Sequence, residues 1–307
     1  MRGKRVLVTG ASGHLGAHLV PALLSAGSEV LALIGPTSDP RRLASTRKSI
    51  RIVRGDVRDE SWRKHKAFSG GVDVIYHLAA AGIDPKRRQV ELMMDTNIKG
   101  TLNALEAARS WKSARFVYCG SSAEYPAGPS LSELTPIAPV SEYGVSKAAG
   151  GLLANAFFRR YGVPVVSVRP FMLYGPMEAP FRLVSLAISS ALKGRDVELS
   201  DGNQKKDWVY VGDAAEALVA AGAVSGIEGE AFNVSSGRAH SVREVVEETL
   251  RQIGGSARPL FGAVPRRAED VDVHVGNPDK ARRLLGWKAR TGLRDGVKKT
   301  IEWHRRR

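Results

Sequence analysis

The stretch RVLVTGASGHLG, residues 5–16, runs from a short apolar segment directly into a glycine-rich turn. Valine and leucine before the turn predict a strand, and the residues after it predict a helix. In that context Gly10 permits the tight turn, Gly13 lets the backbone approach a pyrophosphate, and Gly16 allows the helix to pack closely on the strand. The amide groups of the helix N-terminus favour an anion. We therefore expect a dinucleotide-binding turn, with a plain glycine turn as the alternative.

Short apolar strands alternate with helices through the rest of the first half of the chain. Strands are expected at residues 29–35, 50–56, 72–80, 114–122 and 163–170, and helices at about 91–109 and 143–160. Strands that are almost continuously apolar are buried on both faces, which is typical of a parallel sheet covered by helices. Right-handed crossovers then give a doubly wound α/β fold of the Rossmann type.

The alternation ends after Pro170, where FMLYGPMEAP (171–180) is rich in proline and glycine. One more strand, in EAFNVSSG (230–237), is expected to return to the sheet. The simplest division of the chain has two parts: a nucleotide-binding domain (1–170 and 207–236) and a smaller, discontinuous C-terminal substrate domain (171–206 and 237–307).

The composition is that of an ordinary globular protein, with 307 residues, 43% of them hydrophobic and 25% charged. The single cysteine, Cys119, excludes an intrachain disulfide and fits a reducing compartment. The apolar run after the basic start is too short for a signal peptide, and no stretch approaches the ~18 consecutive apolar residues of a membrane span. We expect a cytoplasmic protein without a membrane partner.

The formal net charge of +15 raises the local concentration of anions around the protein. Its basic residues are scattered, without an aromatic-interleaved stripe and without a zinc or RNA-binding signature. The charge therefore favours a phosphorylated small molecule, or a generally basic host proteome, over a nucleic-acid partner. No metal ion is expected.

The dinucleotide is decided at the end of the second strand. NAD-binding proteins of this type carry an acidic residue there to hold the ribose hydroxyls, and this chain has Gly35. Thr37, Ser38, Arg41 and Arg42 follow and offer donors for a 2′-phosphate. Asp39 lies a few residues too late for the ribose unless the loop bends back. The pattern favours NADP(H), with NAD(H) as the alternative.

Further along the chain, motifs follow the glycine turn in a characteristic order. They are HLAA (77–80), CGSSAEY (119–125), Tyr143-x-x-x-Lys147 and RPFMLYGP (169–176). With them the chain resembles the extended branch of the short-chain dehydrogenase/reductase superfamily, which contains nucleotide-sugar epimerases, dehydratases and reductases. DGNQKKDWVYVGDAAEAL (201–218), FNVSSG (232–237) and NPDKARRLLGW (277–287) are similar to its C-terminal blocks, so the resemblance covers almost the whole chain.

The resemblance implies a proton-transfer role for Tyr143, which lies on the same helix face as Lys147. A phenol has a pKa near 10, so acting as a base at neutral pH requires help from Lys147 and from the positive nicotinamide ring. Lys147 would also bind the nicotinamide ribose. Ser122 would bind the reacting oxygen, with Ser121 as the alternative one position earlier.

The resemblance also implies contacts to the cofactor and to a nucleotide-diphosphate sugar. The implied cofactor-binding residues are Gly10, Gly13, His14, Leu15, Gly16, Thr37, Ser38, Arg41, Asp56, Val57, Leu78, Ala79, Ala80, Lys147 and Pro170. The implied substrate-binding residues are Ser122, Glu124, Tyr143, Met172, Asn233 and Arg267. Asp56 would hold the adenine and Arg267 the diphosphate, and Asn97 would brace the sheet. A turn residue, a capping amide and a solvated charge are the alternatives for Asp56, Asn233 and Arg267.

Departures from the family pattern bear on the reaction. Met172 replaces an asparagine that contacts the sugar nucleotide, and Lys206 replaces an arginine. SSAEY is one residue shorter than in common 4-epimerases and resembles 4-keto-6-deoxy sugar-nucleotide reductases. Dehydratases place a catalytic glutamate where Glu124 stands, but Ala123 lacks their usual polar partner, so a structural role for Glu124 is open as well.

The favoured function is an NADPH-dependent 4-keto-6-deoxy sugar-nucleotide reductase acting by hydride transfer at C4. The alternatives are a 4-epimerase or 4,6-dehydratase that recycles bound NAD, and a non-catalytic dinucleotide-binding protein. A homodimer is expected, because the helices at 91–109 and 143–160 pair across a two-fold axis in the family.

Overall fold

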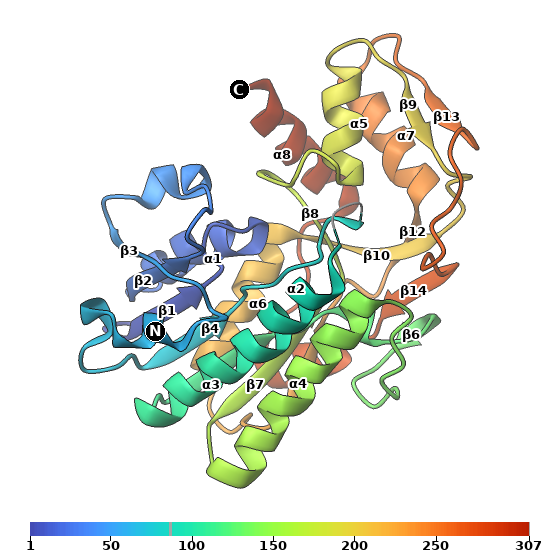
Figure 1. The fold of residues 1–307 in the computed structure, drawn as a ribbon. Helices are drawn as coiled ribbons and strands as arrows, with labels where there is room; N and C mark the ends of the chain where they lie inside the picture. The colour runs from blue at the N-terminus through green and yellow to red at the C-terminus, as the bar shows by residue number, and fades with distance from the viewer. Residues whose placement is uncertain (86–87, 307) are drawn as a thin grey trace.

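The computed structural model describes residues 1–85 and 88–306 and has two lobes (Figure 1). The larger lobe contains a seven-stranded sheet in the order β11-β7-β5-β4-β1-β2-β3, in which every paired strand is parallel. In chain order the strands are β1 (Arg5–Thr9), β2 (Glu29–Ile34), β3 (Ile50–Arg54), β4 (Val74–His77), β5 (Arg115–Cys119), β7 (Val165–Pro170) and β11 (Ala231–Val234). The expected doubly wound α/β fold is confirmed.

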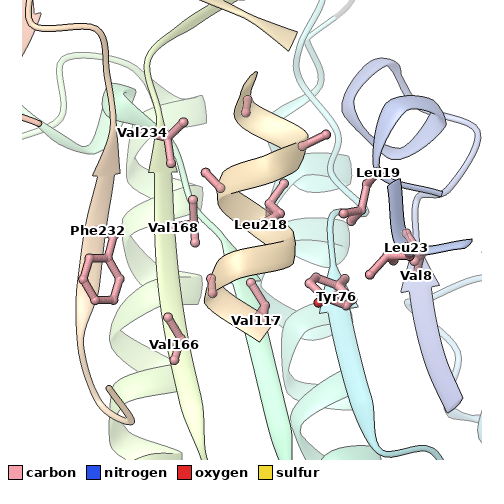
Figure 2. Close-up of a cluster of buried hydrophobic side chains, with 14 of the residues drawn as sticks. Val8, Leu19, Leu23, Tyr76, Val117, Val166, Val168, Leu218, Phe232 and Val234 are labelled. Carbon is pink, nitrogen blue, oxygen red and sulfur yellow. The ribbon is translucent and has the colours of Figure 1, made fainter. Parts of the chain in front are cut away.

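Helices cover both faces of this sheet, which explains why its strands are apolar along their whole length. On one face lie α1 (His14–Ser25) and α6 (Val211–Ala223). Figure 2 shows this layer, in which Leu19 and Leu23 of α1 and Leu218 of α6 pack among strand residues such as Val8 and Val168. Leu7, Ile75 and Phe116 point to the opposite face, against α3 and α4. Alternate residues of one strand thus enter two different cores.

On that opposite face, the helix expected at 91–109 is made of three segments. These are α2 (Val90–Met94), a π-helical turn (Asp95–Lys99) and α3 (Gly100–Ser110), and they pack against α4 (Glu142–Tyr161). Asn97, fully buried in the π turn, accepts a hydrogen bond from Ala81 N at 2.8 Å and donates one to Ser146 Oγ at 2.8 Å. The turn therefore ties the loop after β4 to α4, and Asn97 joins a loop to a helix.

The smaller lobe is built from a second sheet and three helices. Strands β12 (Ala239–Ser241), β10 (Lys205–Tyr210), β14 (Val273–Gly276) and β6 (Gly128–Leu131) follow one another, and β8 (Met172–Tyr174) also pairs with β10. The helices α5 (Leu183–Ala191), α7 (Val242–Ile253) and α8 (Leu293–Arg305) pack together at the upper right of Figure 1, beside the pair β9 (Val197–Leu199) and β13 (Pro259–Phe261).

Two strands, β10 and β6, belong to a different lobe from the one that the sequence-based division expected. Residues 207–210, expected in the nucleotide-binding domain, belong to β10 of the second sheet, and β6 joins that sheet from within the first 170 residues. The chain returns to the larger lobe at α6, which packs against the larger sheet. Among the described residues, no helix is both long and apolar enough to cross a membrane.

Candidate active site

The carboxyl ends of β1, β4, β5 and β7 face a cavity of about 370 Å³, at the edge where open α/β sheets bind ligands. The predicted residues that line it are Gly10, Gly13, His14, Leu15, Gly16, Leu78, Ala80, Ser122, Tyr143, Lys147, Pro170, Met172 and Arg267. They come from both halves of the chain. The structure therefore gathers the glycine turn, the Tyr143–Lys147 pair and part of the predicted substrate side at one place.

The glycine turn has the shape that a dinucleotide requires. Gly10 has φ +68°, and a Cβ added there would stand 2.7 Å from Ala79 N. A Cβ at Gly16 would stand 2.5 Å from Gly10 O, so neither position accepts a side chain without a backbone shift. Gly13 is the N-cap of α1 and makes no side-chain capping hydrogen bond, which leaves the helix N-terminus suited to an anion. The turn fits the predicted cofactor.

Tyr143 and Lys147 lie one helical turn apart on α4. Burial raises the pKa of Tyr143 to about 12, and burial lowers the pKa of Lys147. The Lys147 ammonium lies 4.7 Å from the centre of the Tyr118 ring, and Tyr118 Oη donates a hydrogen bond to Lys147 O at 2.7 Å. The protein by itself therefore keeps the phenol protonated, so the lowering of its pKa that the resemblance implies would need Lys147 together with the positive charge of a bound nicotinamide ring.

Two serines at the end of β5 line the cavity. Burial dominates the pKa of Tyr143, and a hydrogen bond with the Ser121 side chain acts in the opposite direction. Ser121 Oγ also accepts a hydrogen bond from Ala123 N at 3.1 Å. Ser122 Oγ has no hydrogen-bond partner among the described residues. Ser121 is thus already engaged by groups of the protein, whereas the predicted Ser122 lines the cavity without such a side-chain bond to a described residue.

Glu124 does not line the cavity, in contrast to its predicted contact with substrate. Its side chain is 1% exposed. One carboxylate oxygen accepts from Ser121 N at 2.8 Å, closing a capping box, and the other accepts from Arg169 Nε at 2.7 Å. Because both oxygens are taken up by the protein, the placement of Glu124 is structural.

Asn233 was also predicted to contact substrate, and the structure corrects this. It is fully buried in β11, where its side chain accepts a hydrogen bond from Tyr125 Oη at 3.0 Å and donates one to Leu131 O at 2.8 Å. Tyr125 Oη in turn accepts from Arg169 Nη1 at 2.7 Å. Asn233 therefore extends the Glu124 network and links the two sheets through β6.

Several predicted cofactor residues lie outside the cavity: Thr37, Ser38, Arg41, Asp56, Val57 and Ala79. Ala79 lies directly behind Gly10. The Arg41 side chain, 89% exposed, pairs with Asp39. Asp56, predicted at the adenine, is held by Arg58 at 2.6 Å. The structure thus does not bring these residues to the cavity that the glycine turn lines.

Gly35 leaves space that the following loop fills. Ser38 Oγ lies 2.8 Å from the position of a Cβ at residue 35, where an acidic side chain would begin. Arg54, at the end of β3, donates to Pro36 O at 2.8 Å and to Ser38 O at 3.2 Å. The Ser38 hydroxyl and the Arg54 side chain thus lie near the position where NAD-binding proteins of this type carry an acidic side chain. Sequence reasoning missed Arg54 because it lies on the neighbouring strand.

Hydrogen bonds that sequence reasoning missed hold the loop after β8 against the cofactor side, and two of the residues that make them, His14 and Arg42, were predicted to contact the cofactor instead. His14 Nε2 and His18 Nε2 lie 3.1 and 2.9 Å from Pro176 O, and Arg42 Nε donates to Met177 O at 2.9 Å. Burial lowers the pKa of His14 to about 3, so this ring is neutral. These hydrogen bonds bring Glu178 and Arg182 to the cavity, where no motif had indicated them. In the sequence, the position of Glu178 and Arg182 at the end of the Pro/Gly-rich segment was the only indication that they belong to the site.

The described residues contain no group of three or more His, Cys, Asp or Glu side chains that could hold a metal ion.

Comparison with protein-family models gives a match over residues 6–235 to the NAD dependent epimerase/dehydratase family. The chain belongs to this family. It is therefore an enzyme of the NAD-dependent epimerase/dehydratase type, which confirms the resemblance drawn from the motifs.

Individual epimerase/dehydratase relatives match the chain over almost its whole length. The UDP-glucose 4-epimerase of Mycolicibacterium smegmatis is 32% identical over 314 residues, covering 98% of each chain. The dTDP-glucose 4,6-dehydratase of Streptomyces niveus is 30% identical over 322 residues, 98% of this chain and 93% of its own. The structure of MoeE5 in complex with UDP-glucuronic acid and NAD matches with a TM-score of 0.87 and 34% identity, covering 98% of this chain and 99% of that one.

These matches support nucleotide-sugar chemistry with a nicotinamide dinucleotide. The two named relatives are an epimerase and a dehydratase, so the predicted preference for a reductase receives no support from them. The bound dinucleotide named for MoeE5 is NAD, so the predicted preference for NADP(H) receives none either.

Proposed function

We propose that the enzyme epimerises a nucleotide-diphosphate sugar at C4, by removing hydrogen from that carbon and returning it to the opposite face. The observation that carries this proposal is the convergence of Tyr143, Lys147 and the free Ser122 hydroxyl on one cavity, with Glu124 locked away from it. Oxidation and reduction at one carbon need a proton acceptor, a hydride acceptor and little else. The cavity of about 370 Å³ has the size of a small-molecule site.

The chain's own residues would divide the work as follows. Tyr143 takes the proton from the C4 hydroxyl and later gives it back, and Lys147 holds the phenolate form by its charge. Ser122 donates a hydrogen bond to the reacting oxygen, while Ser121 fixes the phenol. When bound against the glycine turn, the dinucleotide supplies the hydride acceptor. Met172 and Arg267, which line the cavity on the other side, contact the sugar and the diphosphate.

Dehydration is disfavoured by the same geometry. A 4,6-elimination needs a carboxyl group beside the sugar, at the position of Glu124 in the family's dehydratases. Here Glu124 bonds Arg169 and the Ser121 amide, and the neighbouring position is Ala123. With both oxygens bonded inside the protein, Glu124 has none left to offer a bound sugar. The proposal therefore prefers epimerisation to dehydration.

A 4-keto sugar-nucleotide reductase using NADPH is the second candidate, favoured by the end of β2. Gly35 leaves the ribose without a carboxylate, and Ser38 and Arg54 stand in its place. A free 2′-phosphate would find donors there, and enzymes that consume reduced cofactor at each turnover commonly use it in this form. Oxidoreduction at C4 by Tyr143 is common to both candidates.

One experiment on the purified protein separates the two candidates. The protein is precipitated with acid to identify any retained dinucleotide, and intact protein is incubated with UDP-glucose or UDP-glucuronic acid without added cofactor. An epimerase retains dinucleotide and produces the C4 epimer, detected by NMR. A reductase retains little, and consumes NADPH only when a 4-keto sugar nucleotide is supplied. Failure of both assays would contradict sugar-nucleotide oxidoreduction.

A further inference from the structure

A second cavity, of about 230 Å³, adjoins the first on the side of the smaller lobe. Its walls include the apolar side chains of Phe181, Leu186 and Trp208. The two cavities share part of their lining, and the shared residues include Met172, Glu178, Arg182, Lys206, Arg267 and Asp270. Three of these six are cations. The border between the cavities therefore carries a cluster of positively charged side chains.

This arrangement matches the order of parts in a nucleotide sugar. The sugar must reach Tyr143 in the first cavity, which leaves the second for the nucleoside. The anionic diphosphate that joins the two parts then lies at the shared border, beside Arg182, Lys206 and Arg267. Lys206 is already held in place there, since its Nζ donates to Val271 O at 2.9 Å.

Glu178 is an acidic residue at the border between the cavities, where a bound nucleotide sugar would place its anionic diphosphate. It is 6% exposed, and its Oε1 lies 3.4 Å from Arg182 Nε. Its Oε2 is buried and has no hydrogen-bond partner in the part of the chain that the structure describes. A buried oxygen without a partner is costly. An ionised Glu178 would repel the diphosphate and occupy Arg182, whereas a protonated one would do neither.

We propose that Glu178 is a proton-dependent gate for the nucleotide diphosphate: it takes up a proton when the diphosphate binds, releases Arg182 to the phosphates, and donates its own hydrogen bond to them. The proton comes from solvent and goes to Glu178 Oε2 or Oε1, so that no covalent bond in the substrate changes. This inference rests on the proposed function, because it assumes a nucleotide-diphosphate substrate.

The pKa of Glu178 lies near neutral pH, so the carboxyl group can change its protonation state there. Burial raises the pKa of Glu178 to about 7, and the Arg182 guanidinium opposes that rise. A nearby diphosphate would raise this pKa further, because it disfavours the carboxylate. Above neutral pH the free protein therefore has to be protonated before it binds, and the affinity falls as pH rises.

Other titratable groups near the border between the cavities change protonation state at a different pH from Glu178. Burial lowers the pKa of His14 to about 3 and that of His274 to about 4, and burial also lowers the pKa of His18, so these rings stay neutral. Burial lowers the pKa of Lys206 as well, so its loss of charge at high pH would weaken anion binding too. The remaining charged groups facing the border are Arg88, Arg182, Arg267, Glu269 and Asp270. A variant at Glu178 separates its contribution from that of Lys206.

The test is calorimetric titration of the full-length protein with UDP-glucose, and with dTDP-glucose, from about pH 6 to about pH 8.5, a range in which their diphosphate keeps its charge. Wild-type affinity should fall about tenfold or more over that range, with uptake of one proton measured as a buffer-dependent heat. Glu178→Gln, which cannot ionise, should bind as tightly at high pH as the wild type does at low pH. Glu198→Gln, a glutamate in the second cavity, should keep the wild-type slope.

Each outcome decides something. A pH-independent wild-type affinity, or an unchanged slope in Glu178→Gln, overturns the gate and leaves the proposed function standing. Binding of neither nucleotide sugar at any pH overturns the proposed function and the gate together. Parallel titrations with NADH show which diphosphate is sensed, and a slope found only with NADH overturns the assignment to substrate. Thermal melting of Glu178→Gln and a second variant, Glu178→Met, guard against misfolding, since either neutral side chain should remove the slope.

Discussion

Tyr143 has to release a proton at a place where burial holds its pKa at about 12. Replacing it with phenylalanine removes only the hydroxyl, so Tyr143→Phe should lower kcat by about 10²- to 10⁴-fold. Dinucleotide affinity should change little, because the ring remains. Lys147→Ala should damage both turnover and dinucleotide affinity, since Lys147 serves both. Steady-state kinetics and dinucleotide titration check these effects, and near-wild-type turnover of the phenylalanine variant would sink the mechanism.

The two serines can be distinguished by what each is already bonded to. Ser122→Ala should lower kcat at least tenfold with an almost unchanged melting temperature, because its hydroxyl bonds no described residue and in the proposed mechanism donates to the reacting oxygen. Ser121→Ala removes an N-cap, so it should cost about 1 kcal/mol of stability along with a smaller loss of kcat. Kinetics and thermal melting of both variants give the comparison. A larger kcat loss in Ser121→Ala would move the substrate contact to Ser121.

Individual residues were predictable from sequence where a backbone requirement or a fixed spacing identified them. Gly10 and Gly16 have no room for a Cβ, and Tyr143 and Lys147 are one helical turn apart, so both patterns survive any change in the surroundings. Glu124 and Asn233 depend instead on partners from distant strands. Arg169 lies 45 positions from Glu124, and nothing in the local sequence says that the two pair.

At the scale of elements, the loop after β2 carries the choice of cofactor. For the second candidate, the NADPH-dependent reductase, we expect NADPH to bind at least about tenfold more tightly than NADH, the effect of one charge-assisted contact. Arg41→Ala combined with Arg54→Ala should remove that difference while leaving NADH affinity nearly unchanged, since NADH lacks the 2′-phosphate. Calorimetry with both reduced dinucleotides measures it. Arg51→Ala, which removes the same charge from β3, is the matched control.

Two results would contradict this choice of cofactor. Equal affinities for the two dinucleotides in the wild-type protein would mean that Ser38 and Arg54 do not read the phosphate. Tightly retained NAD after purification would favour the proposed epimerase over the NADPH-dependent reductase. Either result would leave the role of Tyr143 unaffected.

Elements of the larger sheet were predictable because helix and strand periods differ and each strand is short and apolar. The irregular elements were not. The π turn at Asp95–Lys99 depends on the burial of Asn97 against Ala81 and Ser146, which are distant in sequence. Strand β6 has the sequence GPSL, with little strand character, and it forms because β14 offers it an edge.

At the scale of the whole molecule, α3 and α4 leave an apolar surface exposed on the larger lobe. Leu102 is 37%, Val145 44% and Leu152 62% exposed. We expect these helices to pair with their copies in a two-fold dimer. Leu152→Glu should therefore give monomers in light scattering at micromolar concentration. Leu134→Glu, on a loop residue that is 94% exposed, should leave the wild-type mass unchanged. A monomeric wild-type protein would refute the dimer.

The pairing of Glu124 with Arg169 also restricts the order in which this site can change during evolution. Both groups are buried, so removing either one alone strands the other and costs about 3–5 kcal/mol, out of a typical total stability of about 5–15 kcal/mol. Changing both together should cost much less than the sum, which is strong epistasis. A lineage that acquired another use for the Glu124 carboxylate would first need a neutralising substitution elsewhere. Paths through either single mutant lead through poorly folded intermediates, so the network preserves the present chemistry as well as the fold.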